Sequence, residues 1–166
     1  MILSADKKDR SRGSILLESI IAINIIVVGL LGVLNLLSNS LALNRDVGQK
    51  FVATYLAVEG IEVVKNLIDT NYANGRPWND GLSDGTSTVS YDSNSLGPDS
   101  GNLQLNDNGI YNYIGGKPTF FKREIGIKNL PVDGQTYEIK VVSKVKWLTK
   151  KGPVEVDLED HFFNWR

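Results

Sequence analysis

An acidic side chain near the start of a membrane-length apolar stretch has the clearest potential for chemistry in this chain. Glu18 closes the sequence Arg12-Gly13-Ser14-Ile15-Leu16-Leu17-Glu18. No charged residue occurs from Ser19 through Asn44, and 14 of the 18 residues at 20–37 are Ile, Leu, Val or Ala. An ionised side chain in lipid costs roughly 2–4 kcal/mol, so this position predicts a dedicated cationic partner for the carboxylate.

A new amino terminus at Ser14 would supply that cation. Cleavage of the peptide bond after Gly13 gives Ser14 an ammonium group, and Glu18 then lies four residues further on, on the same helical face. The helix dipole already favours a carboxylate in the first turn, and the ammonium offsets much of its remaining desolvation cost. The pair can form within one chain or between two chains packed side by side.

These residues resemble the processing signal of type IV pilins and pseudopilins. The shared pattern is a short basic leader, a glycine, a small residue, three aliphatic residues, a glutamate and a long apolar helix. The resemblance implies that a prepilin peptidase removes residues 1–13 after Gly13 and methylates the amine of Ser14. It also implies that Glu18 neutralises the terminus of a neighbouring subunit during filament assembly.

Two departures from the pattern and one further likeness refine the resemblance. Ser14 replaces the commoner Phe or Met, and Ile15-Leu16 lacks the usual Thr, but neither change alters the physics. Residues 53–69 are similar to the first helix of the PilV and GspI group of minor pilins and pseudopilins, and residues 145–147 and 163–165 are similar to its C-terminal end. This group therefore supplies the expected fold and partners.

The expected fold is α+β and pilin-like: a long N-terminal α-helix, its outer half transmembrane, packed against a small antiparallel β-sheet. The predicted divisions are a cytoplasmic leader peptide (1–13), a transmembrane or filament-core half of the helix (14–44) and a globular head (45–166). Within the head we expect helix over 45–70, a polar variable loop over 71–109 and antiparallel sheet over 110–166.

Apolar periodicity extends the helix beyond the membrane stretch, and we expect one helix from about Ile15 to Asp69. The expected terminator is Asn74-Gly75, followed by Pro77. The predicted sheet-covered face consists of one stripe and the residues that widen it: Val47, Phe51, Tyr55, Val58 and Ile61, with Val52, Leu56, Val63 and Leu67.

The remaining head alternates between turn-forming and strand-forming segments. Gly, Asn, Asp, Ser or Pro make up 26 of the 39 residues at 71–109, and Trp78 is expected to anchor this loop in the core. Strands are expected at 110–114, 119–128, 136–147 and after Gly152, with Asp133-Gly134 as a hairpin turn. Alternation predicts an inward row and a charged outer row: Tyr137, Ile139, Val141, Val145, Trp147, Val154, Val156 and Leu158 inward, and Glu138, Lys140, Lys144, Lys146, Glu155, Asp157 and Glu159 outward.

Charge and composition predict the orientation and exclude some chemistry. Lys7, Lys8, Arg10 and Arg12 outnumber Asp6 and Asp9 before the apolar stretch, which places the leader in the cytoplasm and the head outside. The chain has no cysteine, so it has no thiol nucleophile and no disulfide framework. The expected location is the cytoplasmic membrane and then a filament. The expected partners are other pilins, the prepilin peptidase, the inner-membrane assembly platform and lipid.

Several alternatives use the same residues differently. A membrane-anchored extracytoplasmic binding module that does not polymerise has the same topology, and a secretory signal peptide would be cut at 38–42. A third alternative is nucleic-acid binding by a basic stripe formed by Lys140, Lys144 and Lys146. The overall charge of −1 disfavours this function.

Enzymatic and metal sites are weaker readings. Gly81-Leu82-Ser83-Asp84-Gly85, with Asp157 or Asp160 and His161, has the residue order of a hydrolase, but Ser83 lacks a strand before it and a helix after it. A set of acidic loop residues leaves calcium binding open: Asp80, Asp84, Asp99 and Asp107. We therefore assign no catalytic residue, no cofactor and no metal ligand, and expect a non-enzymatic subunit.

Overall fold

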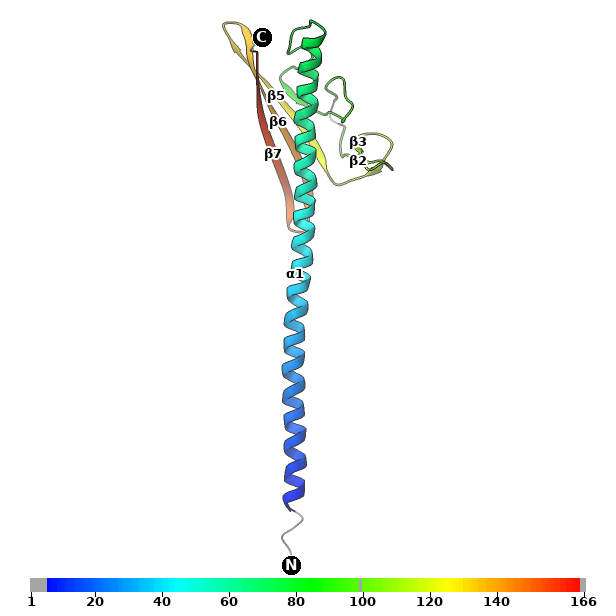
Figure 1. The fold of residues 1–166 in the computed structure, drawn as a ribbon, viewed down its shortest axis with the longest axis vertical. Helices are drawn as coiled ribbons and strands as arrows, with labels where there is room; N and C mark the ends of the chain where they lie inside the picture. The colour runs from blue at the N-terminus through cyan, green and yellow to red at the C-terminus, as the bar shows by residue number, and fades with distance from the viewer. Residues whose placement is uncertain (1–5, 99, 165–166) are drawn as a thin grey trace, which may run out of the picture. The chain divides into compact units, whose positions relative to one another are not determined.

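The fold is α+β, in a computed structural model that describes residues 6–98 and 100–164 and places side chains from Gly13 onward. In this part of the chain, helix α1 (Asp6–Ala73) precedes a four-stranded sheet of order β1-β5-β6-β7 and a three-stranded sheet of order β3-β2-β4, both antiparallel (Figure 1). The strands are β1 Gly85–Ser87, β2 Gln104–Leu105, β3 Tyr111–Asn112, β4 Lys117–Pro118, β5 Lys122–Val132, β6 Gln135–Thr149 and β7 Gly152–Phe163. The predicted α+β class, a long apolar helix with a small antiparallel sheet, is confirmed.

The chain divides into two compact units, Met1–Asp46 and Val47–Arg166. In the first unit every residue at 13–45 is exposed, although most of these side chains are aliphatic. The Gly13–Ala73 part of α1 is long and apolar enough to cross a membrane, by length and composition. Lipid or other apolar helices would remove this surface from water.

Both ends of α1 differ from the sequence prediction. The helix begins at Asp6 rather than near Ile15, because residues 6–12 contain neither proline nor glycine and continue the helical pattern. It ends at Ala73 rather than Asp69. Gly75, at φ 69°, adopts the left-handed conformation, and the N–H of Arg76 donates to the carbonyl of Asn71 at 2.9 Å. The last helical residue thus lies four positions beyond the predicted one, while the residues predicted to terminate the helix, Asn74-Gly75, are the ones that do so.

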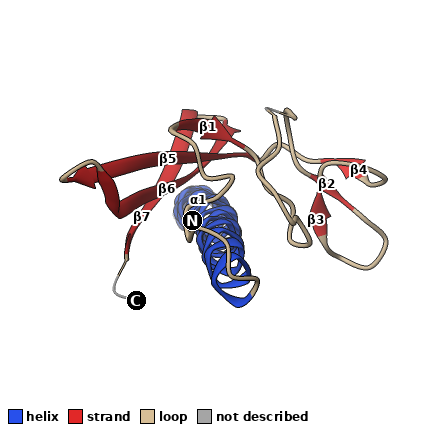
Figure 2. Ribbon diagram, turned by 90° about the horizontal axis from the view of Figure 1, so that it is seen from above, coloured by secondary structure: helices blue, strands red, loops and turns tan. Residues whose placement is uncertain are grey.

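Small residues form the part of α1 that meets the sheet within the second unit. Ala53 and Ala57 are fully buried, and Gly60 lies so close to the sheet that a Cβ added there would be 2.5 Å from Oγ of Ser143 and 2.7 Å from Cδ1 of Ile125. Figure 2 shows the helix lying along one face of β5, β6 and β7. The sheet approaches α1 closely because these positions have almost no side chain.

The predicted sheet-covered stripe of α1 is wrong in most of its members. Val47, Phe51, Tyr55 and Val58 are 47–61% exposed and lie on the helix face opposite the sheet. The rest of the predicted face does meet the core: Ile61, Leu56 and Val63 are buried, and Val52 and Leu67 are partly buried. We call Val47, Phe51, Tyr55 and Val58 the outer stripe.

Replacing Gly60 by alanine is expected to destabilise the second unit by about 1–2 kcal/mol. Overpacking against Ser143 and Ile125 costs about 1–3 kcal/mol, which alanine's better helix propensity offsets by up to about 1 kcal/mol. Gly48→Ala is the matched control, because nothing lies within 4 Å of a Cβ there, and it should stabilise the helix. Urea unfolding followed by the fluorescence of buried Trp78 and Trp147 measures both effects. Equal stabilisation by the two substitutions would contradict the close approach.

The sheet follows the predicted alternation, with one exception. Ile139, Val141, Val145 and Trp147 are buried, but Tyr137 is 53% exposed. Tyr137 stands near the hairpin end of β6, where its ring meets Phe163 edge-on at 6.1 Å rather than the helix. The predicted hairpin turn is confirmed, because the two residues between β5 and β6 both have positive φ, Asp133 at 51° and Gly134 at 81°.

The polar segment after α1 is held to the core at several points. Trp78 is buried, as predicted, and Asn71 donates from its amide to the carbonyl oxygens of Trp78 and Asp80. The carboxylate of Asp84 accepts from Nζ of Lys128 and from the backbone N–H of Asn129, both at 2.7 Å. These hydrogen bonds lower the pKa of Asp84 far below its usual range. The segment predicted as a polar variable loop thus also contains the short strands β1 and β2.

Candidate processing and assembly site

The three residues predicted for processing and assembly lie within one exposed stretch of α1. Gly13, Ser14 and Glu18 are all helical and exposed, and nothing lies within 4 Å of a Cβ added at Gly13. Ser14 and Glu18 are four residues apart in continuous helix, so they share a face as the sequence predicts. The peptide bond after Gly13 is therefore sterically accessible on this chain.

Cleavage at this bond requires local unwinding. Gly13 and Ser14 are inside α1 rather than at its end, and a peptidase acts on extended backbone. Glycine lowers helix stability by about 1 kcal/mol relative to alanine, so Gly13 makes opening of this turn less costly. If this bond were cut, Ser14 would become the first residue of a shorter helix, and Glu18 would lie in its first turns, at the positive end of the dipole.

Three polar side chains in the apolar half of α1 donate hydrogen bonds to the backbone of the helix itself. Each donates to the carbonyl oxygen four residues earlier: Ser19 to Ile15 at 2.8 Å, Asn24 to Ile20 at 2.7 Å and Ser38 to Leu34 at 2.9 Å. A free hydroxyl or amide in lipid would be costly, and these bonds reduce that cost. The carboxylate of Glu18 cannot make a bond of this kind, because a carboxylate accepts hydrogen bonds and does not donate them to a carbonyl.

A buried arginine links helix, sheet and loop, and the sequence analysis missed it. Arg123 of β5 is fully buried, and its Nη1 donates to the carbonyl of Leu56 at 3.0 Å and to the carboxylate of Glu59 at 2.8 Å. Its Nη2 donates to the carbonyl of Val89 in the loop after β1. The one sequence signal of its burial is its place in the strand alternation, because Arg123 is in phase with the inward residues Ile125 and Ile127.

The residues predicted for the charged outer row lie on the outer face of the sheet and form ion pairs there. Three lysines of β6 pair with acids of the neighbouring strands: Lys140 with Glu159 at 2.7 Å, Lys144 with Asp157 at 3.0 Å and Lys146 with Glu124 at 2.6 Å. These pairs lower the pKa of Glu124 and of Glu159 and raise the pKa of Lys144. Each of the three lysines that suggested a nucleic-acid-binding stripe is thus paired with a carboxylate.

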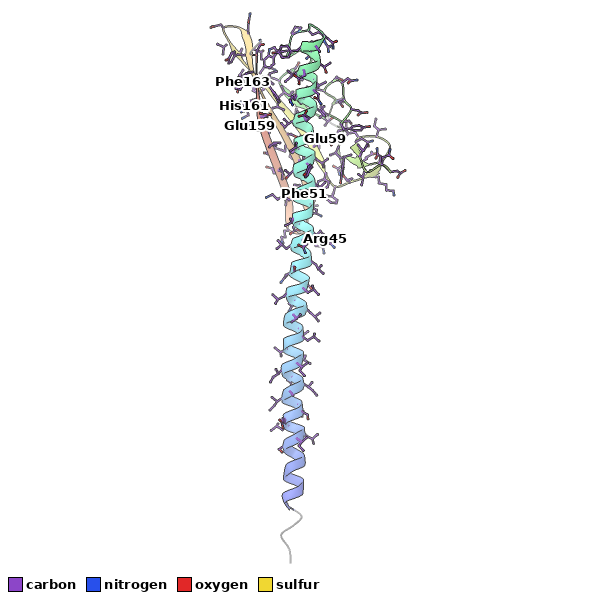
Figure 3. The ribbon with its side chains drawn as sticks, in the orientation of Figure 1. Arg45, Phe51, Glu59, Glu159, His161 and Phe163 are labelled. Atoms are coloured by element: carbon purple, nitrogen blue, oxygen red, sulfur yellow. The ribbon has the colours of Figure 1, made fainter. Side chains whose placement is uncertain are left out.

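His161 belongs to this outer face and not to a nucleophilic site. Its Nδ1 contacts the carboxylate of Glu138, and its Nε2 lies 3.0 Å from Glu159. Figure 3 shows His161 and Glu159 close together along β7. The hydrogen bond with Glu138 is the main reason that the pKa of His161 is raised, and the bond with Glu159 adds to it. Ser83 precedes β1, at the opposite edge of the sheet from β7, so β5 and β6 separate it from His161. The hydrolase order is therefore not assembled.

The acidic loop residues do not form a metal site in the part of the chain that the structure describes. No group of three or more His, Cys, Asp or Glu side chains there could hold a metal ion. The carboxylate of Asp84 is occupied by Lys128 and Asn129, and Asp80 pairs with Arg76 at 3.6 Å. Asp99, the third member of the predicted set, lies outside the described residues.

Comparison with known proteins adds no relative: no family model matches this chain, and no curated protein or solved structure gives a significant match. What the structure establishes is the class: an α+β chain whose long N-terminal helix has one half able to cross a membrane and another half packed on an antiparallel sheet.

Proposed function

We propose that this chain is a minor type IV pilin or pseudopilin, a structural subunit that assembles into a filament after a prepilin peptidase cuts it following Gly13. The observation that carries the proposal is Glu18, an acid near the start of a charge-free apolar helix and four residues from Ser14. A carboxylate placed there is favourable only with a cation beside it. The terminal amine of a processed subunit is that cation.

Assembly then proceeds by helix packing and charge neutralisation. The apolar half of α1 moves from lipid into contact with the apolar helices of other subunits, and Glu18 pairs with the methylated amine of a neighbouring subunit. The outer stripe of the second unit supports this mechanism, because it offers large apolar side chains on the helix face away from the sheet. Phe51 and Tyr55 meet edge-on at 4.6 Å and are both 61% exposed, so the two rings are available to a neighbouring subunit.

The same physics serves type IV pili, type II secretion pseudopili and competence filaments, so the proposal names the class of subunit. As a minor component it would prime or modify the filament. The second candidate is a membrane-anchored binding module that stays outside the cytoplasm and never polymerises. It has the same apolar helix and the same exposed head, but it gives no reason for an acid at position 18.

Mass spectrometry of the protein from its native membrane tests the proposal. We expect an N-terminus at Ser14 that carries a methyl group, since cleavage and methylation follow each other on the same amine. Gly13→Ala serves as the processing variant and should leave the full-length chain in the membrane. An N-terminus at Met1 in the unsubstituted protein, or at residue 39 or beyond, would contradict the pilin proposal.

A further inference from the structure

Strand β7 leaves a long edge of the main sheet open. It is the last strand in the order β1-β5-β6-β7 and runs for 12 residues, from Gly152 to Phe163. Figure 2 shows β7 on the side of the sheet away from the loops that carry β2, β3 and β4. Among the described residues, no backbone group of β7 is hydrogen-bonded beyond β6 and β7 themselves. Open edges of this length are usually shortened or covered in soluble domains.

The direction of the backbone groups identifies which part of the edge can bind. Asn164 donates from its N–H to Tyr137 of β6, whereas the N–H of His161 turns away and donates to its neighbour Asp160 at 2.8 Å. Because antiparallel pairing alternates, even-numbered residues of β7 bond to β6 and odd-numbered residues face the open edge. The donors at this edge are therefore the N–H groups of Glu155, Asp157 and Glu159.

Both ends of this edge are blocked. Pro153 has no N–H, and the N–H of His161 is already occupied by Asp160. The open part is thus confined to residues 155–159, about the length that a short extended segment covers. A long strand is disfavoured at either end, which restricts the register of any partner.

Side chains along the same edge define the chemistry of the partner. The outward row of β7 is acidic, with Glu155, Asp157 and Glu159 exposed by 55, 43 and 46% even though lysines of β6 pair with them. The inward row, Val154, Val156 and Leu158, is only half-buried because no strand covers it. The sheet therefore goes from a basic row on β6 to an acidic row on β7, and a basic row continues the alternation.

A second copy of β7 does not fit this edge. Pairing of β7 with itself places its acidic row against the same acidic row, and like charges directly opposite each other are destabilising. The acidic row thus protects the edge from self-association while it leaves the three N–H donors available.

We propose that residues 155–159 of β7 bind an extended segment of a partner protein by strand addition, and that this segment alternates Lys or Arg with aliphatic residues. The backbone of the segment bonds to the odd-numbered residues of β7. Its aliphatic side chains cover Val154, Val156 and Leu158, and its basic side chains pair with the acidic row. This surface does not involve α1, so the proposal stands or falls independently of filament assembly.

Amide hydrogen exchange of the full-length chain in detergent micelles tests the proposal, with the peptide acetyl-(Lys-Val)3-Lys-amide as the probe. We expect exchange at Glu155, Asp157 and Glu159 to slow by at least about tenfold at saturation, which corresponds to about 1.4 kcal/mol. A Glu-Val peptide of equal length should give no protection. The Lys-Val peptide N-methylated at the backbone of every residue keeps its charge but has no residue N–H to donate to the carbonyl oxygens of β7, and it should also give no protection.

Two charge reversals separate strand addition from general attraction between opposite charges. Asp157→Lys should weaken binding of the Lys-Val peptide by at least about tenfold, because it puts like charges opposite each other. Asp92→Lys is the matched control: it reverses an exposed loop carboxylate and should change the affinity by less than about twofold. Tryptophan fluorescence verifies that both variants remain folded, and Asp157→Asn provides a milder substitution at the same site.

Any of three results would overturn the proposal. The first is equal protection by the N-methylated peptide, and the second is equal weakening by the two charge reversals. The third is slowed exchange at the same three amides as the protein concentration rises without peptide, because that result would place a second copy on the edge. Methylation at Ser14 has no bearing on these outcomes, so a failure here is distinct from a failure of the pilin proposal.

Discussion

Replacing Arg123 by alanine is expected to lower the free energy of unfolding of the second unit by about 3–5 kcal/mol. The substitution removes the donors that satisfy Glu59 and the carbonyl oxygens of Leu56 and Val89, and it leaves a cavity between helix and sheet. Truncating a large buried side chain costs about 2–5 kcal/mol, and leaving its buried hydrogen-bond partners unsatisfied adds about 1–3 kcal/mol each, so the loss lies at the upper end for one substitution. Urea unfolding of the full-length chain in detergent, followed by tryptophan fluorescence, measures the change.

Two further substitutions identify the source of the loss. Arg123→Met keeps most of the apolar volume, and Glu59 can recover hydration because its side chain is one-third exposed, so the loss should be smaller than for alanine. Lys65→Ala is the matched control: it breaks an exposed pair with Glu62 on the same helix, at 3.5 Å, and should change stability by less than about 1 kcal/mol. A loss below about 1 kcal/mol for Arg123→Ala would contradict the role of Arg123 as the link between helix, sheet and loop.

The residue type and the distant partners of Arg123 explain why its role was not predicted from the sequence. An arginine in a strand is ordinarily assigned to the solvent face, and the pattern Lys122-Arg123-Glu124 suits an exposed end. Its burial depends on Glu59, 64 residues away, and on two backbone carbonyls that converge only in the folded chain. Such a partner set cannot be deduced from local spacing.

The wrong prediction of the sheet-covered face of α1 has a different cause. Periodicity selects the stripe with the largest apolar side chains, and Phe51 and Tyr55 dominate that choice. The sheet instead selects Ala53, Ala57 and Gly60, because small residues allow strands of β-branched side chains to approach the helix axis. Both faces of this helical segment are apolar, so the hydrophobic pattern alone could not distinguish the covered face from the outer stripe.

Features that depend on local rules were predictable. The hairpin at Asp133-Gly134 follows from two residues that tolerate positive φ, and the alternation in β6 follows from the pleat. Charge pairing on the outer face also follows, since Lys144 and Asp157 are in register across β6 and β7. Tyr137 departs from the alternation because it lies at the hairpin end of β6, where its ring packs against Phe163 instead of the helix.

For the candidate processing site, the structure of this single chain adds little to what the sequence predicts. The spacing of Gly13, Ser14 and Glu18 is a one-dimensional property, and helical structure at these positions keeps Ser14 and Glu18 on one face. Under the proposed function, the cation that pairs with Glu18 forms only on cleavage, and in a filament it would belong to another subunit. A mutation at Glu18 is therefore the direct way to test that pairing.

Replacing Glu18 by alanine is expected to leave membrane insertion and cleavage intact but to reduce incorporation into filaments by at least about tenfold. The substitution makes the helix more apolar, so insertion is favoured. In the filament, however, the methylated amine of a neighbouring Ser14 would lose its counter-ion in an apolar surrounding, which costs a few kcal/mol, and each 1.4 kcal/mol is about a factor of ten. Quantitative immunoblotting of sheared filaments against membranes measures the ratio.

Two variants make this outcome specific for charge at position 18. Glu18→Gln keeps the size and hydrogen-bonding capacity but removes the charge, so it should fail almost as severely as alanine. Glu62→Ala removes an exposed acid from the same helix within the head and should assemble normally. Normal filament abundance with Glu18→Gln would mean that the acid has no cationic partner in the assembled state. The membrane-anchored binding module would then be the better description, because a simple anchor is indifferent to charge at this position.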